Sequence, residues 1–442
     1  MVDNTLSKLL NAVMLVSNAP IDKSIYEQLN LQQSQTIAPQ SLIELSQNNS
    51  QSGSIDTLYI ISIESYTLLP LLNAVHRLLA TQGSVFIHSA LLQHELHASS
   101  LLARVGFKYT MNSGLYQCWQ KIRLPPWQLS FAEESSQEAI SALFLDVFKH
   151  PLSAELWRWK YKKEGGYAVL AYKDNHLIGH YGGMCRDVFI ANRPAKALQI
   201  GDVMVAQKQR GVLSKRGLFF QMCATFLEQY MGDNKPYALG YGFPTERAMR
   251  IAKHQGLYRQ VDRMVEKHWL PLRTRASIFH VIRPLNKTPS VRVRTQIAHL
   301  WQHMLSDFSQ AIIGVRDWDY LCYRYFSHPE KHYYLYRVNH RFSNTPIGII
   351  VLSLEGERCR LMDIVSTQQA FPCLIHHARR LAYDLKAAQL FAWTTLSHQG
   401  LWPSDEGQAI DVCIPSNAWT TKGTLAVATN QWWLTAGDTD FC

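Results

Sequence analysis

A predicted strand, a basic loop and the start of a predicted helix follow one another between residues 201 and 219. The loop of residues 207–217 holds two glycines, two arginines and two lysines. A helix N-terminus offers unpaired N–H groups and a partial positive charge, and glycine allows a phosphate to approach the backbone. The spacing therefore fits a bound pyrophosphate, and a solvated basic loop without a ligand is the alternative.

Three side chains near this segment could transfer protons. Asp202 lies at the beginning of the apolar run before the loop, His180 on the preceding predicted hairpin and Tyr241 on the following predicted strand. Histidine titrates near neutral pH, a carboxylate can also act as a base, and a phenol can act as an acid. Each residue also has a structural interpretation: Asp202 could pair with an arginine, and the other two could be packing residues.

Other catalytic and metal-binding patterns are absent from the sequence. It contains no G-x-S-x-G, no G-x-x-x-x-G-K-[ST] and no H-E-x-x-H motif. The eight cysteines are scattered without a C-x-x-C pair, and the adjacent His376 and His377 have no third ligand at metal spacing. We therefore expect no metal site.

Helix and strand signals alternate around the three candidate residues. The predicted order is a helix, two strand pairs, the basic loop, a helix, a strand and a helix, at residues 135–148, 167–183, 187–206, 207–217, 218–231, 237–243 and 244–256. Gly256 is a suitable end for the last helix. This alternation predicts a mixed α/β domain over residues 129–272.

The segment of residues 129–272 resembles the GNAT superfamily of N-acyltransferases. Residues 200–219 match the fourth strand and the loop that holds the CoA pyrophosphate, and residues 241–247 and 253–257 match the fifth strand and the helix ending. The resemblance implies acyl transfer from acetyl-CoA or another acyl-CoA to an amine. The implied cofactor-binding residues are Val203, Met204, Val205, Gln209, Arg210, Gly211, Lys215, Arg216, Gly217 and Leu218.

The same resemblance bears on the catalytic groups. Family members often place an acidic base where this chain has Asp202, and His180 is the alternative base. The family's general-acid tyrosine corresponds to Ala252, so Tyr241 is the candidate acid.

The third segment, residues 285–442, repeats part of the second. Trp159-Lys160-Tyr161 corresponds to Tyr323-Arg324-Tyr325, and each triplet is followed by an aromatic strand and a strand that opens with Ile-Gly. This internal similarity indicates a duplication. No Arg/Gly-rich loop precedes the helix of residues 373–387, so the third segment resembles a degenerate second GNAT copy.

Residues 1–125 show a strand–helix–strand order that predicts a parallel α/β sheet. Asp56, residues 78–83 and Gly106-Phe107 weakly resemble the second half of a methyltransferase fold. The glycine-rich turn that would hold a cofactor is missing, so we expect a degenerate, non-catalytic Rossmann-like module. The expected fold class is therefore α/β, with this module followed by two GNAT-like domains.

Charge and hydropathy limit the partners. The net charge is +10, and residues 247–294 contain twelve Lys/Arg against two acidic residues. The sequence shows no convincing signal peptide and no apolar stretch of 18 residues, so we expect a cytoplasmic protein without a membrane partner. A small-molecule amine is the expected acceptor, and nucleic acid is not expected because no binding module is recognisable. The alternatives are a non-catalytic scaffold that binds CoA, and a polyanion-binding protein.

Overall fold

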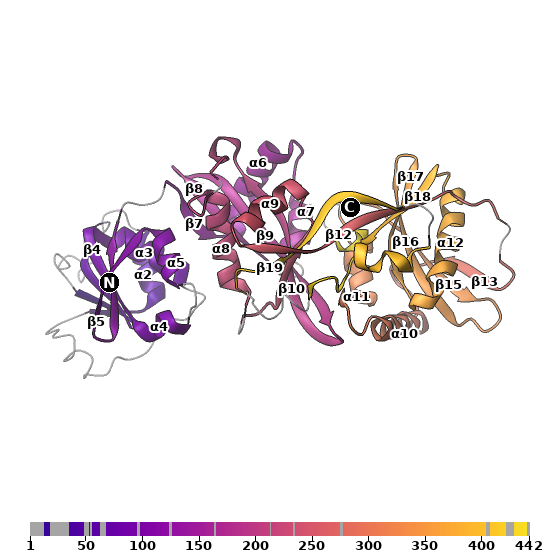
Figure 1. Cartoon of the computed structure of the whole chain (residues 1–442), viewed down its shortest axis with the longest axis horizontal. Helices are drawn as coiled ribbons and strands as arrows, with labels where there is room; N and C mark the ends of the chain where they lie inside the picture. Colours follow the sequence, from indigo (N-terminus) through magenta and orange to yellow (C-terminus); the bar gives the residue numbers. More distant parts are fainter. Residues whose placement is uncertain are drawn as a thin grey trace. The chain divides into compact units, whose positions relative to one another are not determined.

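A computed structural model describes most of the chain. The described residues are 13–17, 35–47, 53, 55–61, 68–94, 98–122, 126–162, 165–212, 214–232, 235–274, 277–403, 407–420 and 428–439. They divide into two compact units, one of residues 1–133 with 169–179 and one of residues 134–168 with 180–442. Several mixed sheets are flanked by helices (Figure 1), which confirms the predicted α/β class.

The first unit contains a sheet with the order β2-β1-β3-β4-β6-β5. The strands are β1 (Val13–Val16), β2 (Gln35–Ile37), β3 (Ile55–Ile60), β4 (Leu79–His88), β5 (Phe107–Ser113) and β6 (Tyr116–Lys121). Strands β1 to β4 are parallel, and β6 is antiparallel to both of its neighbours. Between β3 and β4 runs the amphipathic helix α3 (Leu68–Leu78), whose leucines are mostly buried. The methyltransferase-like origin of this module stays a prediction.

The second sheet has the strand order β11-β10-β9-β14-β20, with β8 beside β9 and β7 beside β8. Its strands are β7 (Gln128–Phe131), β8 (Gly166–Lys173), β9 (His176–Ile190), β10 (Arg193–Val205), β11 (Leu239–Gly242), β14 (Ile312–Gly314) and β20 (Trp432–Trp433). Helices of the same part of the chain are α6 (Gln137–Phe148), α7 (Ala154–Tyr161), α8 (Leu218–Tyr230) and α9 (Glu246–His254). Ser153 and Thr245 cap α7 and α9 by accepting a hydrogen bond from a backbone N–H of the first turn.

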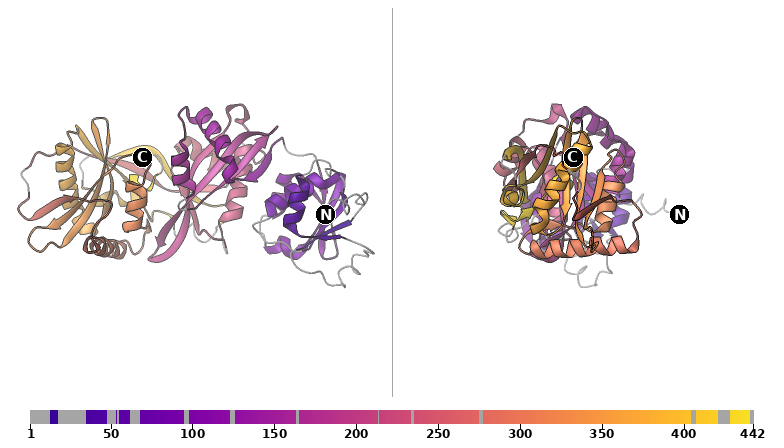
Figure 2. Two further views of the ribbon diagram at one scale, coloured as in Figure 1. Left: turned by 180° about the vertical axis from the view of Figure 1, so that it is seen from behind. Right: turned by 90° about the vertical axis from the view of Figure 1, so that its right-hand side faces the viewer.

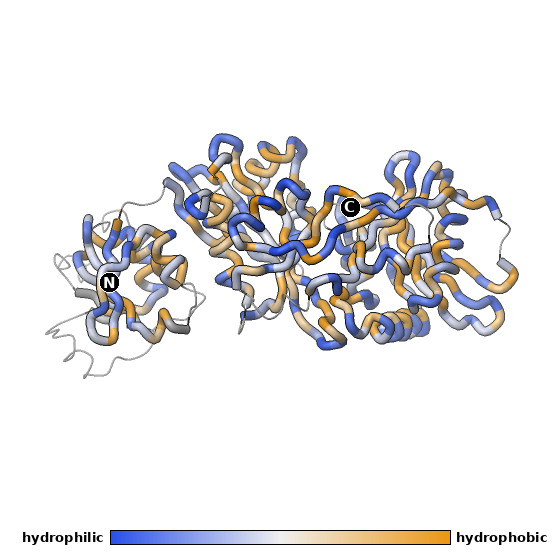
Figure 3. Tube along the Cα trace, viewed as in Figure 1, coloured by the Kyte–Doolittle hydropathy of each residue, from blue (hydrophilic) through white to orange (hydrophobic). Residues whose placement is uncertain are grey.

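The third sheet has the order β13-β15-β16-β17-β18-β12-β19. Its strands are β12 (Tyr258–Trp269), β13 (His280–Pro284), β15 (Tyr334–His340), β16 (Pro346–Glu355), β17 (Arg358–Val365), β18 (Gln389–Thr395) and β19 (Gly407–Asn417). Helices α10 (Val291–Asp307) and α12 (Phe371–Asp384) pack against it (Figure 2). Almost every residue of β17 is buried, including the charged Arg360 and Asp363, which fits its central position in the sheet. Hydrophobic and hydrophilic stretches are interspersed along the chain (Figure 3).

The second and third sheets correspond strand by strand. Neighbours β8, β9, β10 and β11 match β15, β16, β17 and β18 in order. In each set the last two strands are parallel and are joined through a helix, α8 in one and α12 in the other. The predicted tandem GNAT-like arrangement is therefore confirmed.

The two copies exchange strands. Strand β12 follows the first copy in sequence but pairs with β18 of the third sheet, and it runs beside β19 (Figure 1). Conversely, β14 and β20 from the third segment extend the second sheet. Buried residues Met264, Ile312 and Trp432 from these exchanged strands share one hydrophobic cluster. The exchange links the part of the first copy that follows residue 180 to the second copy within one compact unit.

The division of the chain into domains of residues 1–125, 129–272 and 285–442 stays a prediction. Within the described part of the chain, no helix is both long enough and apolar enough to span a bilayer.

Candidate functional site

Strands β10 and β11 separate next to the basic loop. They pair in parallel from Ala197 opposite Leu239 to Ile200 opposite Gly242. Strand β10 then continues to Val205, whereas the chain after Gly242 turns away into α9. Among the described residues, the backbone of residues 201–205 therefore has no strand on the β11 side, and an extended ligand could pair there.

The loop after β10 is shaped by glycine. Gly217 is the N-cap of α8, and its N–H donates to the Ser214 carbonyl oxygen at 2.8 Å. A Cβ atom at this position would collide with the Val212 carbonyl oxygen, so only glycine fits without a shift. Gly211 has a φ of +104°, which other residues rarely adopt. The two glycines bring the loop tightly around the N-terminus of α8.

Basic side chains of this loop lie at the start of α8. The Arg210 guanidinium donates through Nε to the Val205 carbonyl oxygen at 2.7 Å. The Lys215 ammonium lies over the ring of Trp419, 5.0 Å from its centroid, and Arg216 is exposed. The positive charge is thus concentrated where the helix dipole already favours an anion.

Asp202 is held in a buried ion pair. Its carboxylate accepts hydrogen bonds from Lys160 Nζ and from Tyr161 Oη, both at 2.8 Å. The side chains of Lys160 and Asp202 are only 5% and 7% exposed. Burial alone would raise the pKa of Asp202, but the Lys160 ammonium and the hydrogen bonds outweigh it and lower the pKa. A carboxylate stabilised in this way is a weak base.

His180 is fully buried beside Asp202. Its Nδ1 lies 2.7 Å from the backbone carbonyl oxygen of Asp202, which can only accept, so Nδ1 carries the proton. Burial lowers the pKa of His180 despite the nearby Asp202 carboxylate, so the ring is neutral at neutral pH. Nε2 consequently has a lone pair, and it has no hydrogen-bond partner among the described residues. This is the protonation state of a general base.

Two features of the backbone maintain this arrangement. Asp202 has a φ of +50°, in the left-handed region, at the point where β10 loses its β11 partner. A Cβ at Gly182 would lie 2.5 Å from Tyr161 Oη and 2.6 Å from His180 Cε1. Position 182 must therefore be glycine for His180 and Tyr161 to approach each other.

Tyr241 lies in a different environment. It sits opposite Gln199 in the ladder, about 10 Å along β10 from Asp202 at the usual rise per residue. Its ring packs against Trp432 with centroids 4.5 Å apart. Burial is the main cause of its raised pKa, so the phenol keeps its proton. The structure therefore brings His180 and Asp202 together and places Tyr241 apart from them.

Lys160 and Tyr161 were not predicted to belong to the site. Their only signal in the sequence is the repeat with Arg324 and Tyr325. Tyr325 Oη donates to Asp363 Oδ2 at 3.1 Å, from the helical turn before β15 to β17. This contact is the counterpart of the Tyr161–Asp202 hydrogen bond in the first copy, so the repeat preserves a tyrosine–aspartate pair.

The repeated triplets also contact each other reciprocally. Trp159 Nε1 donates to the Tyr323 carbonyl oxygen at 3.0 Å, and Tyr323 Oη donates to the Trp159 carbonyl oxygen at 2.8 Å. The two rings are stacked with centroids 4.9 Å apart. A contact in which residue i bonds residue j and j bonds i is the signature of two-fold symmetry, here between two copies within one chain.

The buried ion pair leads to a stability prediction. Asp202→Asn should lower the free energy of unfolding by about 3 kcal/mol, because Lys160 would remain buried without its counter-charge. Urea unfolding measures the change. Adding Lys160→Met to the variant should recover part of the loss, because the buried positive charge that Asp202 balanced is then gone. A loss below about 0.5 kcal/mol, as is usual for surface substitutions, would contradict the pairing.

Comparisons with known proteins agree with this fold. A family model described as an acetyltransferase (GNAT) domain matches residues 128–256. A probable N-acyltransferase from Enterococcus faecalis has a similar structure, with a TM-score of 0.51, 13% identity and coverage of 68% of this chain and 74% of that one. For a GCN5-related N-acetyltransferase from Kribbella flavida the TM-score is 0.46 and the identity 13%, with coverage of 65% of this chain and 71% of that one. For a tandem GNAT protein from the clavulanic acid biosynthesis pathway the TM-score is 0.44 and the identity 8%, with coverage of 66% of this chain and 98% of that one. No curated protein sequence matches the chain.

Proposed function

We propose that this chain, in which residues 128–256 form a GNAT acetyltransferase domain, transfers an acyl group from an acyl-CoA to an amine. The observation that carries the proposal is the separation of β10 from β11 directly beside a neutral histidine with a free lone pair. An extended pantetheine arm needs an unpaired strand edge, and amine attack needs a base. Both features lie beside Asp202 and support the proposal, because residues 203–205 follow it in β10 and His180 bonds its carbonyl oxygen.

The acyl-CoA would bind along β10 and the loop. Among Val203, Met204 and Val205, the backbone N–H groups that face the open edge of β10 would bond the pantetheine arm and the thioester oxygen. The N-terminus of α8 would hold the pyrophosphate. The loop residues assigned to this role are Gln209, Arg210, Gly211, Lys215, Arg216, Gly217 and Leu218.

In the proposed reaction the acceptor enters as a neutral amine, and His180 Nε2 takes the one proton that the amine nitrogen loses. The amine nitrogen attacks the thioester carbonyl carbon, a C–N bond forms, and the C–S bond breaks as CoA leaves as a thiolate. The thiolate then needs a proton. Tyr241 is the candidate donor from the sequence, but its raised pKa makes the phenol a weak acid, and the structure places it apart from His180. Asp202 is assigned a positioning role, since its carbonyl oxygen fixes the tautomer of His180.

The acceptor that we propose is a small cytoplasmic amine that also carries negative charge, and acetyl is the simplest acyl group. Residues 247–294 contain twelve basic residues and two acidic ones, so they would favour an anionic acceptor such as a nucleotide sugar.

Thermal unfolding with acetyl-CoA and longer acyl-CoAs tests the cofactor site. Ligand at about 100 times its dissociation constant should stabilise the protein by roughly 2.7 kcal/mol, a rise of a few degrees in Tm. Arg210→Ala combined with Arg216→Ala should abolish the rise. The control, Arg193→Ala with Lys196→Ala, removes two exposed charges from the far end of β10 and should keep it.

The second candidate function is a non-catalytic scaffold. Ala252, where the resemblance expects a tyrosine, favours it, as does the engagement of Asp202 by Lys160. Release of free CoA thiol with a panel of amines separates the two functions. If acyl-CoA shifts Tm but no amine releases thiol, the scaffold that binds CoA is favoured. If no acyl-CoA shifts Tm and no amine releases thiol, the enzyme proposal is wrong.

A further inference from the structure

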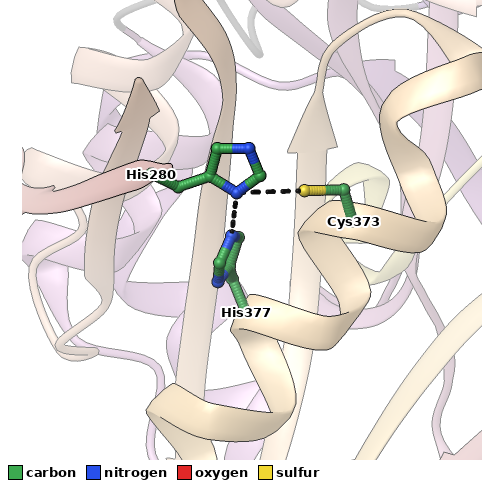
Figure 4. Close-up of side chains that lie close together, drawn as sticks. All are labelled: His280, Cys373 and His377. Carbon is green, nitrogen blue, oxygen red and sulfur yellow. Dashed lines mark hydrogen bonds between the residues drawn. The ribbon is translucent and has the colours of Figure 1, made fainter. Parts of the chain in front are cut away.

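We propose that His280, Cys373 and His377 form a binding site for a transition-metal ion of the zinc type. Their ligand atoms all lie within 4.8 Å of one another. His280 Nδ1 is 2.9 Å from His377 Nε2 and 3.7 Å from Cys373 Sγ. Figure 4 shows the three side chains facing one another from a strand and a helix. The site lies outside the acetyltransferase domain and is independent of the proposed acyl transfer.

The fold explains why three ligands meet here. Cys373 and His377 are four residues apart on α12, so their side chains lie on one face of the helix. His280 is the first residue of β13, and β13 is an edge strand that pairs only with β15 among the described strands. Helix α12 packs on the neighbouring strands of this sheet. We expected no metal from the sequence because the third ligand is distant along the chain.

Two of the three distances between ligand atoms are close to those of a tetrahedral site. Zn–N bonds of about 2.0–2.1 Å and a Zn–S bond of about 2.3 Å place the N and S ligand atoms about 3.5 Å apart and two N atoms about 3.3 Å apart. The observed 3.7 Å and 2.9 Å are within a few tenths of an ångström of these values. Small side-chain rotations would therefore admit the ion, and the fourth position would hold water.

The donor chemistry selects the class of metal. One thiolate and two imidazoles suit Zn²⁺ or Co²⁺, whereas Mg²⁺ and Ca²⁺ require oxygen ligands. Neutral imidazole and thiolate are the forms of these side chains that bind a metal. Metal binding must therefore displace the Cys373 thiol proton, which is released to solvent as the metal–sulfur bond forms.

The residues around the three ligands indicate how tightly the metal ion should bind and what it would connect. His377 Nδ1 is buried and has no hydrogen-bond partner among the described residues. Such outer partners typically raise metal affinity about 10–100-fold, so we expect weaker binding than in structural zinc fingers. The ion would join the edge strand β13 to α12. Arg379, also on α12, donates a hydrogen bond to the Leu270 carbonyl oxygen, in the segment between β12 and β13.

The test is a Co²⁺ titration of the full chain, reduced and without a histidine tag. We expect one equivalent to bind and to give tetrahedral visible bands and a near-ultraviolet sulfur-to-cobalt charge-transfer band, both removed by Zn²⁺. Cys373→Ser should remove the charge-transfer band, and His280→Ala should weaken binding more than about tenfold. The controls His376→Ala, an exposed neighbour, and Cys322→Ser, another half-buried cysteine, should bind as the wild type does.

Two results would overturn the proposal. One is a wild-type protein with no charge-transfer band, and the other is a folded Cys373→Ser variant that retains the band. Should Cys373→Ser fail to fold, alkylation of the wild type replaces it, with each cysteine mapped by mass spectrometry. Zn²⁺ should slow alkylation of Cys373 more than that of Cys322, and equal rates would exclude the site.

Discussion

His180→Asn should lower kcat/KM for acyl transfer by about 10²–10⁴-fold and leave the affinity for acyl-CoA unchanged. The wild-type ring is neutral, and its Nδ1–H donates a hydrogen bond to the Asp202 carbonyl oxygen. Asparagine can keep that hydrogen bond through its amide N–H, but it has no basic nitrogen. The loss should therefore appear in the chemical step. Stopped-flow release of CoA thiol, together with equilibrium binding of acyl-CoA, measures the two quantities.

The pH dependence gives an independent test of His180. A histidine whose pKa is lowered stays unprotonated below the usual value of about 6.5, so kcat/KM should remain level down through pH 6.5 and fall only at lower pH. The free energy of unfolding should also decrease as pH falls. As pH drops below about 6.5 the unfolded ring gains a proton that the folded ring does not, so the unfolding free energy decreases. In His180→Asn this part of the decrease should be absent.

Tyr241→Phe distinguishes the loss of the proposed acid from the loss of the proposed base. The phenol lies apart from His180, so its loss should affect protonation of the thiolate but not the acid limb of the pH profile. An active His180→Asn enzyme with an unchanged acid limb would show that His180 is not the base. Asp202 would then be the remaining candidate.

Local patterns predicted the order of the elements but not all of their partners. The aromatic and Ile-Gly runs of the two copies were recognisable because the burial pattern of a strand depends on its own residues. The exchange of β12 was not, because its alternating residues could pair with either sheet. Which edge a strand joins depends on residues more than 100 positions away, such as those of β18.

The candidate site shows the same limit. His180, Asp202 and Tyr241 were recognisable by residue type and by their places in predicted strands. The positive φ of Asp202 and its pairing with Lys160 were not, because they arise only when α7 packs near the end of β10. The third ligand of the metal site is likewise supplied by a strand 93 residues before Cys373.

Arg316→Met should lower the free energy of unfolding by about 5 kcal/mol, at the upper end for a broken buried ion pair. Arg316 is fully buried between two carboxylates. Its Nη2 is 2.5 Å from Asp438 Oδ2, and its Nε is 3.4 Å from Asp363 Oδ2. Methionine fills similar space but leaves both carboxylates without a cation. Asp438 also caps the turn after β20, so the C-terminal segment should loosen first.

The control and the rescue separate charge from packing. Arg292→Met on the exposed start of α10 should change stability by less than about 0.5 kcal/mol. Adding Asp363→Asn and Asp438→Asn to Arg316→Met should recover part of the loss, because the two uncompensated charges are removed. Equal losses in the single and triple variants would attribute the effect to packing instead.

The sign of the pH dependence identifies the carboxylates responsible. Burial raises the pKa of Asp363, with repulsion from Asp438, while Arg316 opposes the rise. A raised carboxyl pKa contributes stability that is present below about pH 3.9 and lost as pH rises through the folded value. Without Arg316 the pKa of Asp363 in the folded protein should rise further. Protonation of this carboxyl at low pH then removes the uncompensated charge and reduces the loss of stability in the variant. The difference in unfolding free energy between wild type and Arg316→Met should therefore be larger at pH 8 than at pH 5, and a difference independent of pH would exclude these carboxylates as its cause.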